Sequence, residues 1–164
     1  MNVRIHHLFV SPGHNFFGRH GQGAGENPTV EVTEIMCRAG RGVEGDRFLD
    51  YKPDYKGQIT FFAWDIYAAA KRTFAVPGLS AGAFRRNVVL EGLDVNTLIG
   101  RRFSLGGVAF EGTVESKPCY WMEQAVAVGA EEWLRGNGGL RAKILSDGPL
   151  TVGAAELILA EPVA

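Results

Sequence analysis

The sequence has few cysteines, no long apolar run and no excess of either charge. Two cysteines are too few for a disulfide scaffold or a four-cysteine metal site. No stretch approaches the roughly 20 apolar residues that span a bilayer, and the first residues lack the apolar region of a secretory signal. Seventeen Lys and Arg against eighteen Asp and Glu give a net charge of −1, too little positive charge for general nucleic-acid binding. We therefore expect a cytoplasmic chain with no nucleic-acid partner and no membrane partner.

Glycine is the one residue in clear excess. The 164 residues, 46% of them apolar, predict a single domain over 1–164. Twenty-two glycines and seven prolines indicate many tight connections between short elements, which is typical of a β-rich domain rather than a helix bundle. The glycine-rich segment 11–28 is predicted to be a long loop.

Hydrophobic periodicity predicts short strands and few helices. Helical spacing from Trp64 to Phe74 predicts a helix that ends at Pro77, and Asp94 is placed to cap a single turn. The pair Gly106-Gly107 predicts a tight hairpin. A second short helix is expected over 130–134, and strands over 3–10, 30–37 (with an imperfect alternation), 58–62, 87–90, 102–105, 108–111, 140–145, 150–152 and 156–159. This pattern predicts a mainly β (α+β) fold, either a sandwich or a small closed β-barrel with a few peripheral helices.

Cys119 is the first candidate for chemistry. It follows the predicted hairpin, at the point where a strand gives way to a loop, and Lys117 lies two residues before it. A nearby cation favours the thiolate, which attacks electrophilic sulfur and binds soft metals. The alternative is that Cys119 is a small buried hydrophobe. Cys37, beside Ile35 and Met36 in a strand-like run, is expected to be core packing.

Two clusters of arginine are candidates for binding an anion. In the glycine-hinged segment 40–47, Gly45 permits close backbone approach and Arg47 has the fork geometry that grips phosphate. Arg85 and Arg86 lie at the expected entry to a strand, where alternation would send their side chains to opposite faces. Solvent exposure of either arginine is the alternative.

Other suggestive patterns are weaker. The histidines do not show the four-residue helical spacing of a zinc protease, and adjacent histidines in a strand point apart, so a histidine metal site is not expected. The glycines at 18–25 and 136–139 lack the context of a nucleotide-binding loop.

Taken in order, several of these segments resemble the MOSC family, which is named for the C-terminal domain of molybdenum cofactor sulfurase. The resemblance extends over about residues 30–159 and is strongest to the small stand-alone proteins of the family. It rests on the segments Gly42–Arg47, Gln58–Thr60, Phe84–Val88, Leu98–Phe103, Lys117–Cys119 and Gly138–Ala142.

The resemblance implies a MOSC or pyruvate kinase β-barrel-like fold and a cleft for the molybdenum cofactor, a molybdopterin that carries molybdenum and a phosphate. The family's defining cysteine falls on Cys119, which would be the catalytic residue and the metal ligand, or a carrier of persulfide sulfur. Cations would hold the phosphate and polar side chains the pterin edge. The expected cofactor-binding residues are Gly45, Asp46, Arg47, Arg85, Arg86, Asn87 and Lys117.

Three functions remain open at this point. A molybdenum-cofactor-binding protein would act in sulfur transfer or in the reduction of N-hydroxylated compounds. A non-catalytic cofactor carrier is the second reading, and a plain β-barrel interaction domain is the third. The chain is too short to include a pyridoxal-phosphate desulfurase domain, so no pyridoxal phosphate is expected on it. Sulfur transfer would need a separate cysteine desulfurase, and reduction would need a separate electron-transfer partner.

Overall fold

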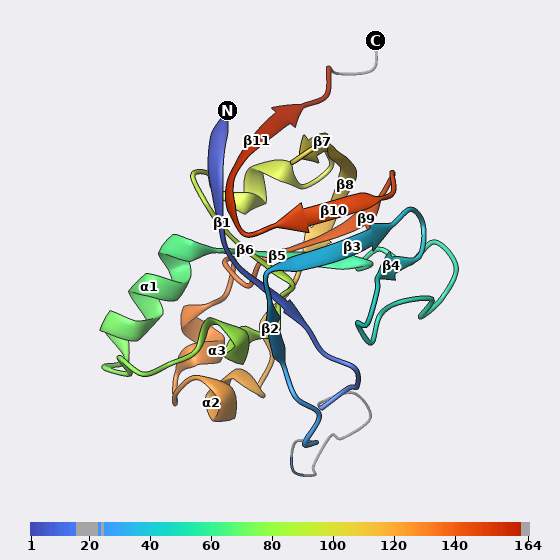
Figure 1. The fold of residues 1–164 in the computed structure, drawn as a ribbon. Helices are drawn as coiled ribbons and strands as arrows, with labels where there is room; N and C mark the ends of the chain where they lie inside the picture. Colours follow the sequence, from blue (N-terminus) through green and yellow to red (C-terminus); the bar gives the residue numbers. More distant parts are fainter. Residues whose placement is uncertain (16–22, 24, 162–164) are drawn as a thin grey trace.

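A computed structural model describes residues 1–15, 23 and 25–161 of the chain. Most of its residues lie in short strands and the loops between them (Figure 1). The strands are β1 (Asn2–Val10), β2 (Val30–Val32), β3 (Glu34–Arg38), β4 (Gly42–Val43), β5 (Ile59–Ala63), β6 (Val88–Glu91), β7 (Arg102–Leu105), β8 (Val108–Glu115), β9 (Leu140–Ile144), β10 (Gly148–Thr151) and β11 (Gly153–Leu159). The helices are α1 (Trp64–Thr73), α2 (Met122–Ala125) and α3 (Ala130–Trp133), with 3-10 turns η1 (Ala81–Phe84) and η2 (Val95–Leu98). These elements confirm the mainly β prediction.

Seven strands close into a barrel. The order is β11-β7-β8-β9-β5-β6-β1, and β1 closes the ring by pairing antiparallel with β11 from Asn2–Glu156 to Ile5–Gly153. Closure removes the exposed strand edges that an open sheet would leave. Side chains alternate along each strand, so that Leu140, Ala142 and Ile144 of β9 are buried while the residues between them are only partly buried. The predicted small barrel is therefore confirmed, and the sandwich alternative is excluded.

The small sheet β10-β3-β4 adds apolar side chains to the barrel core. Ile35, Cys37, Val43 and Leu150 all belong to that core, and Cys37 has no exposed surface. Burial raises the pKa of the Cys37 thiol to about 12, because a thiolate is poorly solvated there. Cys37 is therefore a packing residue, as the sequence predicts.

Two local predictions are confirmed by backbone geometry. Gly106 and Gly107 both have positive φ, 56° and 87°, which is the combination that a two-residue hairpin turn requires. The side chain of Asp94 accepts a hydrogen bond from Asn96 N at 2.9 Å, and thereby caps η2. The hairpin fixes the register of β7 against β8, the strand that leads to Cys119.

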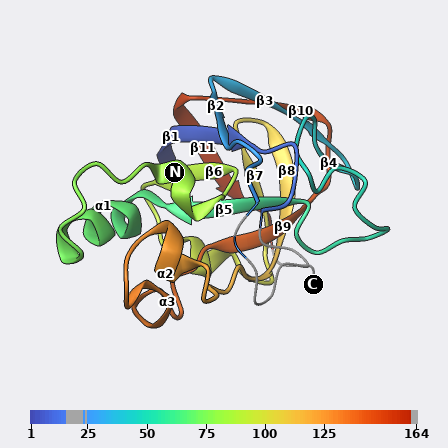
Figure 2. The same ribbon diagram turned by 90° about the horizontal axis from the view of Figure 1, so that it is seen from below.

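A second apolar core lies outside the barrel wall, under the helices. Phe62 of β5 packs there with Tyr67 of α1, Phe84 of η1 and Met122 of α2. Figures 1 and 2 both show the three α-helices on one side of the barrel. Polar groups at the boundary between the barrel wall and the helices can therefore be held between two packed apolar cores. No helix among the described residues is long and apolar enough to cross a bilayer.

The prediction for Phe84–Asn87 is wrong in its local conformation. Phe84 ends η1 and Arg85 takes a left-handed conformation, with φ 55°, so the alternation of a strand begins only at Val88. The short elements β4 and α2 were not predicted, because two and four residues are too few to show a period. Within the predicted loop 11–28, residues 16–22 and 24 lie outside the described part of the chain.

Candidate functional site

Cys119 lies in the connection that leads from β8 into α2. β8 ends at Glu115, and residues 116–119 have no regular secondary structure. The carbonyl of Cys119 accepts a hydrogen bond from Met122 N at 2.9 Å, which begins α2. The residue is exposed, so the buried-hydrophobe alternative is wrong for this cysteine. Its thiol is accessible to a ligand or a partner, unlike that of Cys37.

Arg86 links residues 116–119, which we call the cysteine segment, to two neighbouring segments by hydrogen bonds. Its guanidinium donates from Nε to Gly138 O at 2.9 Å, from Nη1 to Phe84 O at 2.8 Å and from Nη2 to Ser116 O at 3.0 Å. One planar group thus holds a carbonyl two residues before it and two carbonyls from distant parts of the chain. Burial, followed by the charges of Arg141 and Arg47, lowers the pKa of Arg86 to about 10.

Close backbone packing supports the same segment. A Cβ placed on Gly138 would lie 2.2 Å from Ser116 O and 2.7 Å from the Pro118 ring. Only glycine permits this approach. Ser116 N also donates to Gly139 O at 2.8 Å. Residues 138–139, which belong to one of the resembling segments, therefore pack directly against the cysteine segment.

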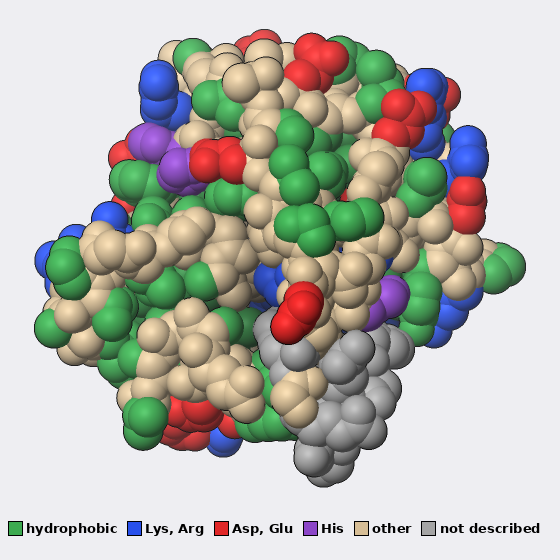
Figure 3. Space-filling model, turned by 60° about the horizontal axis from the view of Figure 1, so that its bottom comes forward, with side chains coloured by type: hydrophobic (Ala, Val, Ile, Leu, Met, Phe, Trp, Pro, Cys, Tyr) green, Lys and Arg blue, Asp and Glu red, His purple; other side chains and the backbone are tan. Residues whose placement is uncertain are grey.

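A cavity of about 220 Å³ opens beside Cys119. It lies at the boundary between the outer wall of the barrel, which supplies Thr60 and Arg141, and the helical side, which supplies Phe84 and Met122. We call it the cysteine cleft. It is lined by Arg47, Phe48, Tyr55, Gly57, Thr60, Phe84, Arg85, Arg86, Ser116, Lys117, Cys119, Met122 and Arg141. Five of these residues are cationic and none is a carboxylate. Figure 3 shows Lys and Arg atoms recessed near the middle of one face of the molecule.

Arg85 and Arg86 line the same cavity, which corrects the expectation that they face opposite ways. The left-handed backbone of Arg85 replaces the extended conformation on which that expectation depended. Arg85 donates to Ser11 Oγ at 2.6 Å, to Gly13 O at 2.9 Å and to Thr29 Oγ1 at 3.0 Å. Burial, followed by the charge of Arg47, lowers the pKa of Arg85 to about 10, and Asp46 opposes the shift.

Arg47 lines one edge of the cleft, and Asp46 lies beside it. Asp46 accepts from Ser11 N at 3.0 Å and from Phe48 N at 3.3 Å, and Arg47 Nη1 lies 3.3 Å from its Oδ1. The Arg47 guanidinium also lies 4.7 Å from the centre of the Phe48 ring. Burial lowers the pKa of Arg47, and the charge of Asp46 opposes this. Gly45 has φ 80° and allows the sharp turn before them.

Asn87 is buried and joins three strands. Its Oδ1 accepts from Thr60 N at 3.0 Å and from Thr60 Oγ1 at 3.2 Å, and its Nδ2 donates to Phe9 O at 3.1 Å. Its own backbone N donates to Thr60 Oγ1. Asn87 lies behind the cleft wall and is not among the cleft-lining residues. Asn87 therefore links β1, β5 and the segment before β6 by hydrogen bonds.

Lys117 and Arg141 differ from the other cations of the cleft. Neither side chain has a hydrogen bond or ion pair within the described residues, whereas Arg47, Arg85 and Arg86 all bond to protein atoms. Arg141, on β9, was not predicted as a site residue, although it lies in one of the resembling segments. The signal was the alternation of β9, which buries Leu140 and Ala142 in the barrel and leaves Arg141 on the outer wall.

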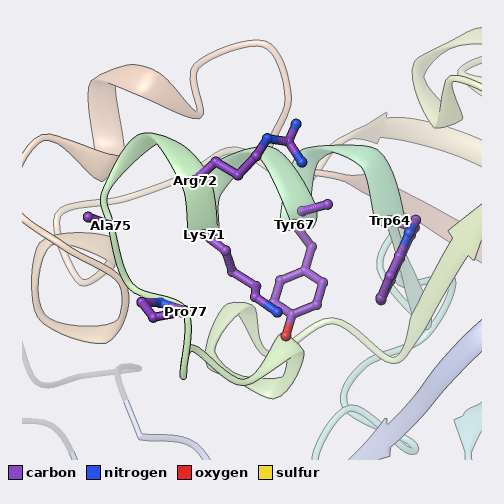
Figure 4. Close-up of a pocket in the computed structure, with 7 residues that line it drawn as sticks. Trp64, Tyr67, Lys71, Arg72, Ala75 and Pro77 are labelled. Carbon is purple, nitrogen blue, oxygen red and sulfur yellow. The ribbon is translucent and has the colours of Figure 1, made fainter.

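A second and larger hollow lies on α1. It has a volume of about 620 Å³ and is lined by Trp64, Tyr67, Ala68, Lys71, Arg72, Ala75 and Pro77. Figure 4 shows that Lys71 extends alongside Tyr67, and its Nζ lies 5.1 Å from the centre of that ring. We call this hollow the α1 groove. All its residues come from one helix and its exit, and none of them is a cysteine, a histidine or a carboxylate.

The histidines of β1 are paired outside the cleft. His6 Nε2 lies 2.5 Å from Glu91 Oε2, and His7 is bonded to Glu31. The His6 ring stacks on Trp64 at 3.9 Å. Among residues 1–15, 23 and 25–161, no three His, Cys, Asp or Glu side chains are grouped to hold a metal ion.

Comparison with known proteins agrees with this architecture. The family model of the MOSC domain matches residues 39–155. A solved structure of the YUAD protein from Bacillus subtilis superposes with a TM-score of 0.75 at 16% identity, and covers 98% of this chain and 97% of its own. YiiM from Geobacillus stearothermophilus gives 0.69 at 17% identity, over 97% and 75%. YiiM from Escherichia coli gives 0.67 at 19%, over 100% and 72%. No curated protein matches significantly.

The structure combines a seven-stranded closed barrel with a cationic cleft beside an exposed cysteine. Since the family model matches well over half of the chain, the protein belongs to the MOSC domain family. The solved structures, all below 25% identity, show the shared fold.

Proposed function

We propose that the protein binds the molybdenum cofactor in the cysteine cleft and acts through Cys119. The observation that carries this proposal is the combination of an exposed thiol with a cavity whose five charged side chains are all cationic. A soft sulfur donor suits molybdenum, and cations suit the phosphate of the pterin. MOSC domains as a family are associated with this cofactor, and for this reason we assign the thiol and the cations to the molybdenum cofactor.

The residues present fit such a group in chemistry. Cys119 would face the metal, and Lys117, Arg47 and Arg141 would face the anionic part. Arg86, Arg85, Asp46 and Asn87 hydrogen-bond to the protein and would hold the cleft in shape around the ligand. Phe48 and Tyr55 stack with ring centres 5.5 Å apart and offer an aromatic wall to a planar group. When bound, the cofactor would supply a molybdenum centre able to exchange electrons or sulfur.

The residues around Cys119 suit two activities of that centre. In the reduction of N-hydroxylated compounds, Cys119 would ligate the metal. The cations would repel other cations and orient the anionic ligand. In sulfur transfer, the exposed thiol would carry persulfide sulfur to or from a partner. With two cysteines in the sequence, the chain has too few for its own iron-sulfur cluster. A separate electron-transfer partner or a separate cysteine desulfurase would therefore complete the reaction, in the cytoplasm.

The proposal is tested by exchanging each cysteine in protein purified from a host that makes the cofactor. Cys119→Ser should fold normally and lose turnover of an N-hydroxylated base, because a hydroxyl is harder and less acidic than a thiol of similar size. Cys37→Ala is the matched control, since Cys37 lies in the barrel core, and it should keep turnover. If wild-type protein holds molybdenum but shows no turnover, the assignment narrows to sulfur transfer or to cofactor carriage. If Cys119→Ser retains both molybdenum and wild-type turnover, Cys119 is neither ligand nor carrier and the proposal fails.

A further inference from the structure

The α1 groove is a mostly apolar face that the fold leaves uncovered. Its residues recur at intervals of three or four along α1 and its exit, so they share one side of the helix. Trp64 lies at one end, Ala75 and Pro77 lie at the other, and Tyr67 and Lys71 lie between them (Figure 4). With a volume of about 620 Å³, the groove has room for an apolar side chain from another molecule.

The cations of the groove have no counter-charge of their own. Lys71 and Arg72 are its two charged residues, and neither side chain forms an ion pair with any residue that the structure describes. The Lys71 ammonium lies near the Tyr67 ring instead. An occupant that combines an apolar side chain with carboxylates would therefore complement the groove.

The chain itself displays such a combination in the loop between α2 and α3. Val128 is 89% exposed, the largest exposed fraction among the large apolar side chains that the structure describes. The Glu123 carboxylate accepts a hydrogen bond from the backbone N of Gly129, directly after Val128, and Glu132 is exposed on α3. Glu132 pairs with Arg135, but both side chains are exposed, so exchanging this pair for another costs little. We call Val128 with Glu123 and Glu132 the acidic knob.

The acidic knob and the α1 groove lie on the same side of the barrel. Both views of the ribbon show α1 beside α2 and α3 (Figures 1 and 2). A Cβ on Gly129 would lie 3.8 Å from the Phe74 ring, and Phe74 directly follows α1. Neighbouring patches of opposite charge suit a two-fold axis, because each copy then offers both halves of the contact.

We infer that the α1 groove is covered by a second copy of this chain, in a two-fold dimer in which Val128 of each copy enters the groove of the other. The carboxylates of each knob then face the cations of the opposite groove. Two-fold symmetry makes the contact twice and leaves no knob free for a third copy. Because each contact is one short loop, we expect a weak and reversible dimer. The groove shares no residue with the cysteine cleft, so the inference does not depend on the proposed function.

Sedimentation equilibrium over a wide range of protein concentration tests the dimer. The wild-type protein should show a monomer–dimer equilibrium that weakens as salt is raised, because salt screens exposed charges. Val128→Arg should raise the dissociation constant about tenfold or more, because it sets a cation against the cationic groove. Since Val128 is exposed in the single chain, this variant should unfold at the wild-type temperature in dilute solution. Ile158→Arg is the matched control, since Ile158 is 53% exposed on β11, and it should dimerise like the wild type.

Charge reversal tests the pairing of knob and groove. Arg72→Glu and Glu132→Lys, both at exposed residues, should each weaken the dimer. The two variants mixed in equal amounts should associate again, because each altered charge meets its opposite in the mixed dimer. A mixture that stays monomeric would contradict the pairing.

The inference is overturned if the wild-type protein is a monomer at every concentration, if it grows beyond a dimer, or if Val128→Arg and Ile158→Arg weaken association equally. Metal analysis of the same samples separates this result from the proposed function. A Val128-dependent dimer without molybdenum would support the inference and contradict cofactor binding, whereas a monomer that holds molybdenum would do the reverse.

Discussion

The cysteine cleft and the α1 groove are two hollows of the same molecule with opposite character. The groove is larger, about 620 Å³ against about 220 Å³, and is built from one continuous segment, residues 64–77. The cleft is assembled from segments around residues 47–60, 84–86, 116–122 and 141. Only the cleft brings together a thiol and a set of cations from distant parts of the chain. Volume alone is therefore a poor guide to the candidate site, which we place where chemically distinct side chains converge.

The first prediction compares Arg86, which lines the cleft, with Arg72, which lines the α1 groove. Arg86→Met should lower the free energy of unfolding by about 3 kcal/mol or more, since three carbonyls lose a charged donor. Arg72→Met, in the exposed part of the groove, should change it by less than about 0.5 kcal/mol. Urea denaturation of both variants measures the difference. Equal changes in the free energy of unfolding would show that the hydrogen bonds of Arg86 do not stabilise the cleft.

The second prediction concerns glycines near the cleft. Gly138→Ala should cost about 1 to 3 kcal/mol of stability and separate the cysteine segment from its support, because the new Cβ would overlap Ser116 O and the Pro118 ring. Gly45→Ala meets no atom within 4 Å and should cost about 1 kcal/mol through its positive φ alone. Thermal unfolding gives the two values. A larger loss at Gly45 would contradict the packing described at Gly138.

Much of the fold could be predicted because its signals are local. The Gly106-Gly107 turn, the Asp94 cap and the period of α1 each depend on a few consecutive residues. The site was less accessible to sequence reasoning. The strand alternation assumed at Arg85 fails because one left-handed residue redirects both arginines into one cavity. The sequence suggests Asn87 and Arg86 as ligand-binding residues, yet in the structure they bond to protein groups, several of them far away in the chain, such as Phe9 O and Gly138 O. Such partners emerge only when the barrel closes.

The third prediction compares the two cysteines. Iodoacetamide should modify Cys119 in the folded protein, because this residue is exposed, and should leave Cys37 almost untouched. With a pKa raised to about 12 by burial, Cys37 would be ionised to about one part in ten thousand at pH 8. Peptide mass spectrometry with and without denaturant measures both sites. Equal modification of the two in native protein would contradict the burial of Cys37.

The smallest effect is expected in the α1 groove. Lys71→Ala removes one ammonium near Tyr67 and should cost about 0.5 to 1 kcal/mol of stability. Its effect on molybdenum content should be nil, because the groove holds no thiol and shares no residue with the cleft. Elemental analysis of Lys71→Ala beside wild type checks this. A clear drop in molybdenum would shift the ligand site towards α1.

Metal analysis shows whether the cysteine cleft holds the molybdenum cofactor, as we propose. The wild-type protein, purified from a host that makes the cofactor, should contain stoichiometric molybdenum and release a phosphorylated pterin on denaturation. Arg141→Gln and Cys119→Ser, both altered in the cleft, should contain less, while Lys71→Ala should match the wild type. Absence of molybdenum and pterin from the wild-type protein would contradict cofactor binding in the cleft.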